Sequence, residues 1–332
     1  MPGSCVSRVS LVAACCALLL ALLPWLADAF GDPYLVTLFS RILIYALAAV
    51  SLDLIIGYGG MVSLGHAAFV GSGAYVVAIL AFHLQEGAPL FGGFLDIQAN
   101  DQALLVWPLA VVISALLAAL IGAISLRTRG MQFIMITLAF AQMLYYLFVS
   151  LEGYGGDDGI SLWSRSRLPG LDLADNVNFY YVCLASLLLF LWLMRRLVYS
   201  RFGRVVRGTR ENQPRMESLG FPVYRYQLAA FTIAGAGAGL AGVLLANQNE
   251  FVSPGLLHWT HSGELIVMVL LGGMGTLLGP VFGAAALLLM EELLSAYTEH
   301  WMFFLGPFLI LVVLFAKRGI YGWICGGGDG HG

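Results

Sequence analysis

Long apolar runs alternate with short polar connections along most of the chain. A run of roughly 20 residues with few charges is typical of a membrane-spanning helix, because it must cross about 30 Å of hydrocarbon. The pattern therefore predicts an all-α integral membrane protein with about ten transmembrane helices in a single domain, residues 1–332. The predicted spans are 9–27, 34–56, 60–82, 104–125, 131–149, 178–199, 227–247, 263–279, 281–298 and 302–316.

Two glycine-rich stretches interrupt the helical pattern. The stretch 57–75 holds six glycines, and 270–285 holds five glycines and a proline. Glycine costs a helix up to about 1 kcal/mol relative to alanine, and broken membrane helices often surround the substrate path of a transporter. We therefore predict discontinuous segments here. The candidate path residues are Gly59, Gly60, Ser63, Gly65, His66, Gly272, Gly273 and Gly275.

Basic residues are confined to a few connections. Most of the 16 Lys and Arg residues fall at 127–129, 195–225 and 317–318, and strict alternation of ten spans puts these segments on one side. The positive-inside rule makes that side cytoplasmic. The prediction is that both termini lie inside, with a cytoplasmic loop at 200–226 and a periplasmic loop at 150–177. Both glycine-rich stretches then lie toward the same side.

Composition excludes several classes of protein. The chain is 60% hydrophobic and 11% charged, with mean hydropathy +0.87 and net charge −3, which argues against a nucleic-acid partner. Five cysteines without CxxC spacing indicate neither a disulfide framework nor a metal site. The sequence contains no G-x-x-x-x-G-K-[ST] motif, and Lys317 is its single lysine, so it binds no nucleotide through a P-loop. Gly235 and Gly239 form a GxxxG pair within an apolar run, which favours helix packing.

Ionisable residues within the predicted spans are candidates for a transport role by default. Two of them sit toward opposite ends of one span, where both can reach an interface, and none is a convincing mid-span carboxylate. This argues against a secondary carrier coupled to protons or sodium. For His66 we expect a helix-end cap or an interhelical hydrogen bond. The charged residues in question are Arg41, Asp53, Glu264, Glu291 and Glu292.

The segment RENQPRMESLG (210–220) is a short, mostly polar stretch in the predicted cytoplasmic loop. Asn212 is a capping residue, Pro214 fits a first helical turn, and Gly220 ends the helix. These signals predict a short helix over 213–219. Met216 and Leu219 are three residues apart and should share one face.

A helix of this length is not stable alone in water. It must be held by the chain's own membrane helices or by a partner. A basic loop resting on anionic lipids explains the arginines but not the cap, the proline and the apolar pair. We therefore predict that 210–220 docks a partner protein.

The sequence resembles a known family at these residues. RENQPRMESLGFPVYRYQLAAFTIAGAGAGLAG (210–242) is similar to the cytoplasmic loop and following helix of LivM-type permeases of branched-chain amino acid ABC transporters. GYGGMVSLGHAAFVGSGAY (57–75) looks like the broken-helix signature of that family, and HWTHSGELIVMVLLGGMGTLLGPVFGAA (258–285) is also similar. The resemblance extends over most of the chain from about residue 34 to 322.

This resemblance implies a type II ABC-importer-like permease in the bacterial inner membrane. It implies a LivH-type sister permease, two cytoplasmic ATPases that bind ATP and Mg²⁺, and a periplasmic or lipid-anchored binding protein. Gln213 stands where family members often have glutamate. No motif determines the substrate, and related permeases carry branched-chain or other amino acids, amides or urea. The coupling-loop residues implied are Arg210, Glu211, Asn212, Gln213, Pro214, Met216, Glu217, Leu219 and Gly220.

Overall fold

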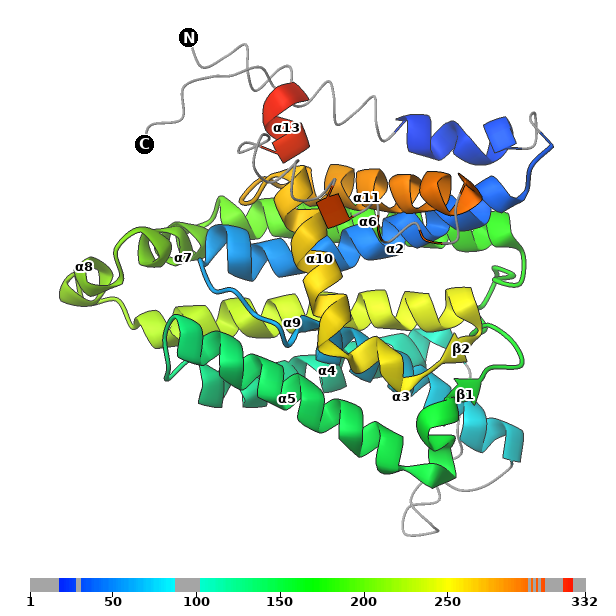
Figure 1. Ribbon diagram of the computed structural model, residues 1–332, viewed down its shortest axis with the longest axis horizontal. Coiled ribbons are helices and arrows are strands. Elements are labelled where there is room, and N and C mark those ends of the chain that lie inside the picture. The colour runs from blue at the N-terminus through cyan, green and yellow to red at the C-terminus, as the bar shows by residue number, and fades with distance from the viewer. Residues whose placement is uncertain are drawn as a thin grey trace.

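A computed structural model describes residues 18–27, 31–86, 102–297, 300, 303, 306–307 and 319–324. Seven helical segments in this part are long and apolar enough to cross a membrane, and most of them run along the long axis of Figure 1. The predicted all-α membrane protein is therefore confirmed at this level. The seven are α2 with its π-helical extension η1 (Tyr34–Tyr58), α3 (His66–Glu86), α4 (Ala103–Ser125), α5 (Met131–Ser150), α6 (Asn176–Val198), α9 (Val223–Asn249) and α11 (Gly279–Tyr297).

The remaining three predicted spans have no full-length counterpart among the described residues. Of 9–27, the structure describes the helix Leu18–Ala27, and 302–316 lies mostly outside the described residues. The predicted span 263–279 is wrong, because α10 (Trp259–Gly272) stops at Gly273, whose φ of +112° ends the helix. With 14 residues, α10 is roughly 21 Å long, shorter than the hydrocarbon core.

Helix α9 lies at the centre of the packing, against α2, α3 and α4. Small residues on α9 allow this close approach. A Cβ added at Gly235 would overlap Ala118 of α4, and one added at Gly239 would overlap Ser114. The interpretation of this glycine pair as a packing motif is confirmed.

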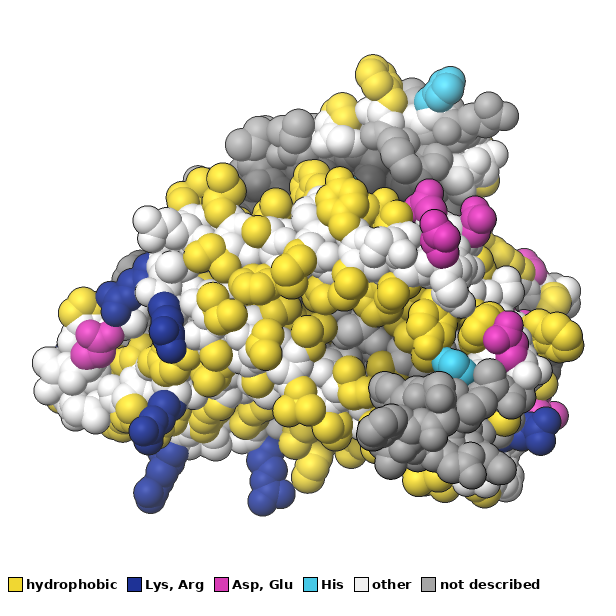
Figure 2. Space-filling view, turned by 90° about the horizontal axis from the view of Figure 1, so that it is seen from below, with side chains coloured by type: hydrophobic (Ala, Val, Ile, Leu, Met, Phe, Trp, Pro, Cys, Tyr) yellow, Lys and Arg dark blue, Asp and Glu magenta, His cyan; other side chains and the backbone are white. Residues whose placement is uncertain are grey.

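Helices α4 and α5 present most of their surface to the outside of the chain. Large apolar side chains such as Leu116, Met131 and Tyr146 are exposed there, and hydrophobic side chains cover much of the face shown in Figure 2. Such a surface fits contact with lipid acyl chains or with another membrane helix.

The two predicted loops lie at opposite ends of the molecule (Figure 1). One end carries α7 (Arg201–Glu211) and α8 (Gln213–Ser218). At the other end, β1 (Ile160–Ser161) pairs antiparallel with β2 (Phe251–Val252), a contact the sequence did not indicate. The short elements at this end are η3 (Glu152–Tyr154), η4 (Gly156–Asp158) and η5 (Pro254–Leu257), while α13 (Gly319–Ile324) packs against α10 and α11.

Candidate functional site

The segment 210–220 forms the predicted short helix with the predicted caps. The Asn212 carboxamide oxygen accepts a hydrogen bond from the Arg215 backbone N–H at 3.0 Å, and a proline occupies the first turn. The helix ends one residue earlier than expected, with Leu219 as its C-cap. Gly220 follows with a φ of +85°, a conformation that favours glycine.

Helix α8 is held on one side by its own chain. Met216 packs so closely on α7 that a Cβ at Gly208 would lie 2.8 Å from its sulfur. Glu217 forms an ion pair with Arg129 of the α4–α5 connection at 3.1 Å. Leu219 instead is 64% exposed, so the predicted apolar pair does not form one buried face.

Five of the coupling-loop residues implied by the resemblance, those we expect to face the partner, are exposed at this end of the molecule. All five are exposed to the outside of the chain. Two of them also bond within it, since Asn212 caps α8 and Glu217 pairs with Arg129. An exposed leucine beside exposed polar groups is the composition of a protein docking surface. The five are Glu211, Asn212, Glu217, Leu219 and Gly220.

The first glycine-rich stretch is broken over a shorter range than predicted. After η1 (Leu54–Tyr58) the chain is not helical until His66, where α3 begins. Side chains satisfy backbone groups in this break. The Leu64 N–H donates to the Thr137 hydroxyl at 3.3 Å, and the Gly65 N–H donates to the Ser63 hydroxyl at 3.2 Å.

The second break joins α10 to α11 over residues 273–278. The Thr276 hydroxyl donates to the Gly273 carbonyl at 2.7 Å and accepts from the Gly279 N–H at 3.1 Å. Gly275 has a φ of +74°. Its N–H donates to Asp53, the residue just before η1, at 2.8 Å.

Asp53 and Arg210 join the two breaks to the α7–α8 loop. Asp53 is only 2% exposed, which is contrary to the expectation that it reaches an interface. Arg210, at the end of α7, donates to the carbonyl of Gly57, and its Cγ would lie 2.9 Å from a Cβ at Gly60. A Cβ at Gly275 would lie 3.4 Å from the Arg210 guanidinium. Arg210 therefore packs inward, on both breaks.

The other candidate path residues occupy different surroundings. Ser63 and His66 are fully buried, and His66 Nε2 lies 2.8 Å from the Ser51 hydroxyl of α2. The expected interhelical hydrogen bond of His66 is thus confirmed. A Cβ at Gly59 would meet the Ile55 carbonyl, and one at Gly272 would overlap Gly279 of α11.

A second group of charged residues, which the sequence did not group together, lies at the opposite end of the same helices. Arg41 of α2 is 3.6 Å from Glu291 of α11. The Tyr34 hydroxyl donates to Glu292 at 2.9 Å. These pairs are separated by some 250 positions in sequence, so no local signal predicts them.

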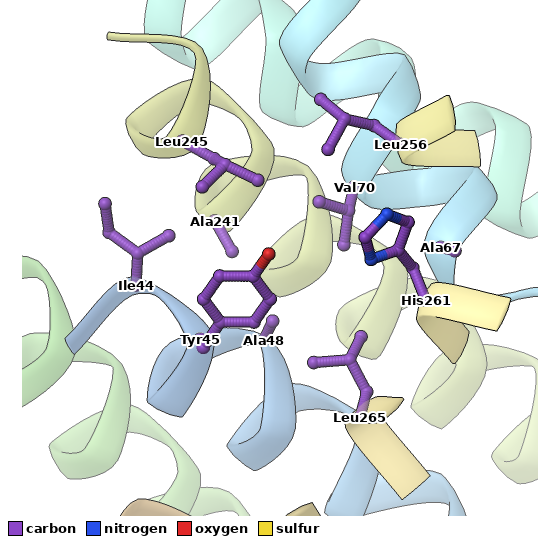
Figure 3. Close-up of a pocket in the computed structure, with 10 residues that line it drawn as sticks. All are labelled: Ile44, Tyr45, Ala48, Ala67, Val70, Ala241, Leu245, Leu256, His261 and Leu265. Carbon is purple, nitrogen blue, oxygen red and sulfur yellow. The ribbon is translucent and has the colours of Figure 1, made fainter. Parts of the chain in front are cut away.

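An apolar pocket lies beside this group, between α2, α3, α9, η5 and α10 (Figure 3). Two polar side chains, Tyr45 and His261, contribute to its wall. His261 Nδ1 lies 2.9 Å from a carboxylate oxygen of Glu264. The apolar walls come from Ile44, Ala48, Ala67, Val70, Ala241, Leu245, Leu256 and Leu265.

Comparisons with known proteins agree with this architecture. Residues 34–314 match the profile of the family described as branched-chain amino acid transport system / permease component. The chain is 30% identical to the Salmonella typhimurium high-affinity branched-chain amino acid transport system permease protein LivM, over 84% of this chain and 68% of that protein. It is 29% identical to LivM of Escherichia coli with the same coverage.

The sister permease protein LivH of Escherichia coli is 33% identical over 37% of this chain and 41% of its own length. No solved structure gives a significant match. The family profile covers most of the chain, including both breaks and the α7–α8 loop. The chain therefore belongs to the family of permease components of branched-chain amino acid transport systems.

Proposed function

We propose that the chain is a non-catalytic permease subunit of an ATP-driven importer for branched-chain or related hydrophobic amino acids. It forms the translocation path with a LivH-type sister permease. Two cytoplasmic ATPases, which bind ATP and Mg²⁺, drive transport, and a binding protein delivers the substrate. The family membership and the LivH likeness support this assembly.

The observation that carries the proposal is the α7–α8 loop. It is a capped helix with an exposed leucine, placed between two spanning helices at the basic end of the chain. We propose that this end faces the cytoplasm, so that both termini lie inside the bacterial inner membrane. A chain that has no P-loop in its sequence needs such a contact to draw on ATP hydrolysis.

The mechanism we propose is rigid coupling, in the manner of a type II importer. Closure of the ATPases moves α8, and α7 transmits the movement through Arg210. Because Arg210 contacts Gly57 and lies against Gly275, both helix breaks receive the same displacement. The spans beyond the breaks then switch the path between outward- and inward-open.

The test replaces Leu219 with aspartate and measures co-purification of the ATPases together with ATP-dependent leucine uptake. We expect both to fall, because a charge in an apolar docking contact must be desolvated. Leu171→Asp is the matched control, since Leu171 is also an exposed leucine but lies at the opposite end of the molecule. It should leave co-purification unchanged. An intact complex with normal uptake in Leu219→Asp would refute the docking assignment.

A further inference from the structure

Charged residues of α2, α10 and α11 form one cluster toward the end of the molecule opposite α8, which we call the outer end. Arg41 lies seven residues from the start of α2, Glu264 five from the start of α10, and Glu291 six from the end of α11. At 1.5 Å per residue all three are roughly 8 to 10 Å inside the helix ends. Three segments distant in sequence thus bring charged side chains close together.

These charged side chains are not hidden within the chain. Arg41 is 41% and Glu264 51% exposed, while Glu291 is 28% exposed. Charged groups at this depth are expensive in lipid and almost always face the interior of an assembly or a water-filled cavity. This face of α2, α10 and α11 is therefore suited to the interior of the transporter rather than to the acyl chains.

The cluster is chemically suited to a zwitterion. Arg41 provides a fork of N–H donors, the geometry that holds a carboxylate. Glu264, Glu291 and Glu292 outnumber it, so the cluster has carboxylates in excess of its one arginine, which suits an ammonium group. In the described part of the chain no group of His, Cys, Asp and Glu side chains could hold a metal ion.

The apolar pocket adjoins the cluster through shared residues. Arg41 lies over the ring of Tyr45, 5.8 Å from its centroid, and His261 pairs with Glu264. Tyr45 and His261 are both wall residues of the pocket (Figure 3). Its volume is only about 20 Å³, little more than one water molecule needs. In this conformation the pocket is too small to hold a leucine side chain, so its walls must separate to admit one.

We propose that this cluster and pocket are a transmembrane binding site for an α-amino acid. The substrate carboxylate binds Arg41, its ammonium group binds Glu264 and Glu291, and its apolar side chain enters the pocket as the walls separate. The proposal rests on the proposed function and narrows its substrate class. Urea and amides carry neither a carboxylate for Arg41 nor an ammonium group for the glutamates.

The test uses the complete transporter in nanodiscs, with Glu264→Cys introduced into a variant whose own cysteines are replaced by serine. A water-soluble, membrane-impermeant methanethiosulfonate reagent should label Cys at this position. In this variant Arg41 and Glu291 still hold the two charged groups of leucine, so leucine at a concentration that saturates the variant should slow labelling at least about fivefold by mass action. Leucinol, which has no carboxylate, and 4-methylpentanoate, which has no ammonium group, should protect much less. Absence of labelling, or labelling that leucine does not slow, overturns the proposal.

Leu109→Cys is the matched control. Leu109 is 45% exposed and lies six residues inside the start of α4, at the same depth on a different face. We expect the reagent to label it at least about tenfold more slowly, since a thiol in lipid is not ionised to the reactive thiolate.

A second experiment separates binding from a purely structural ion pair. In the double variant Arg41→Glu with Glu291→Arg, the pair is restored with its polarity reversed. A structural pair predicts near-normal uptake of leucine, whereas a substrate contact predicts at least about a tenfold loss with the complex and its ATPase activity intact. Near-normal uptake would overturn the proposal. If the wild-type complex itself shows no ATP-dependent uptake, the proposed function fails instead.

Discussion

Asp53 is the residue that most constrains how the inner end of the molecule works. A buried carboxylate is costly unless it is paired and hydrogen-bonded, and this one has the Gly275 N–H as its donor and the Arg210 guanidinium close by. Asp53 thus ties the end of α2 to the second break. Arg210 connects the α7–α8 loop to the same point.

Asp53→Asn tests this junction, because it removes the charge and keeps the shape. We expect the complex to assemble and hydrolyse ATP, while leucine uptake falls about tenfold, a coupling loss near 1.4 kcal/mol. Arg210→Gln should behave alike, and the double variant should lose no more than either single one, since contacting residues are not additive. Asp157→Asn, an exposed aspartate at the other end, is the control. Fully additive losses would show that Asp53 and Arg210 act separately.

At the scale of elements, helix packing depends on where glycines lie. A Cβ at Gly242 of α9 would overlap the Val70 carbonyl of α3. Backbone atoms cannot turn away as a side chain does, so the two helices must separate. The same holds for Gly73 of α3 against Gly239 of α9.

Gly242→Ala should therefore destabilise the protein by about 1 to 3 kcal/mol, the usual cost of overpacking a core. Gly263→Ala of α10 is the matched control, because a Cβ there meets nothing within 4 Å. It should be neutral or stabilising by up to about 1 kcal/mol, from helix propensity. Thermal unfolding of the purified protein in detergent measures both, and equal midpoints for the two variants would contradict the packing account.

The sequence predicted the elements better than it predicted their contacts. Of the ten spans predicted from apolar run length, seven are spanning helices in the described part of the chain, because hydrocarbon thickness acts on each helix separately. Local capping signals placed α8 to within a residue. The glycines of 270–285 predicted the break after α10, but the predicted span 263–279 ran too far because the apolar pattern continues past Gly273.

Contacts between distant segments had no such local signal. Arg210 was assigned to the partner surface from its position in the loop, yet its guanidinium contacts Gly57. The pair of Arg41 and Glu291 likewise joins helices far apart in sequence. Pairings of this kind depend on how the spans are arranged, and hydropathy does not determine that arrangement.

At the scale of the whole molecule, the two ends have different chemistry. One end carries α7 and α8, and the other carries the β1–β2 pair (Figure 1). The two breaks lie toward the first end and the charged cluster toward the second. A movement imposed on α8 can reach the charged cluster along α2 and α11, since these spanning helices run between the two ends. In the proposed mechanism this movement comes from the ATPases that bind α8.

The most direct measurement is leucine uptake into proteoliposomes that contain this chain, its sister permease and the binding protein, with and without the ATPase subunits. We predict uptake against a gradient only when the ATPases and ATP are both present. With the ATPases and ATP both present, the Leu219→Asp variant should show no concentrative leucine uptake. Concentrative uptake at the full rate without the ATPases would contradict the account and identify a secondary carrier.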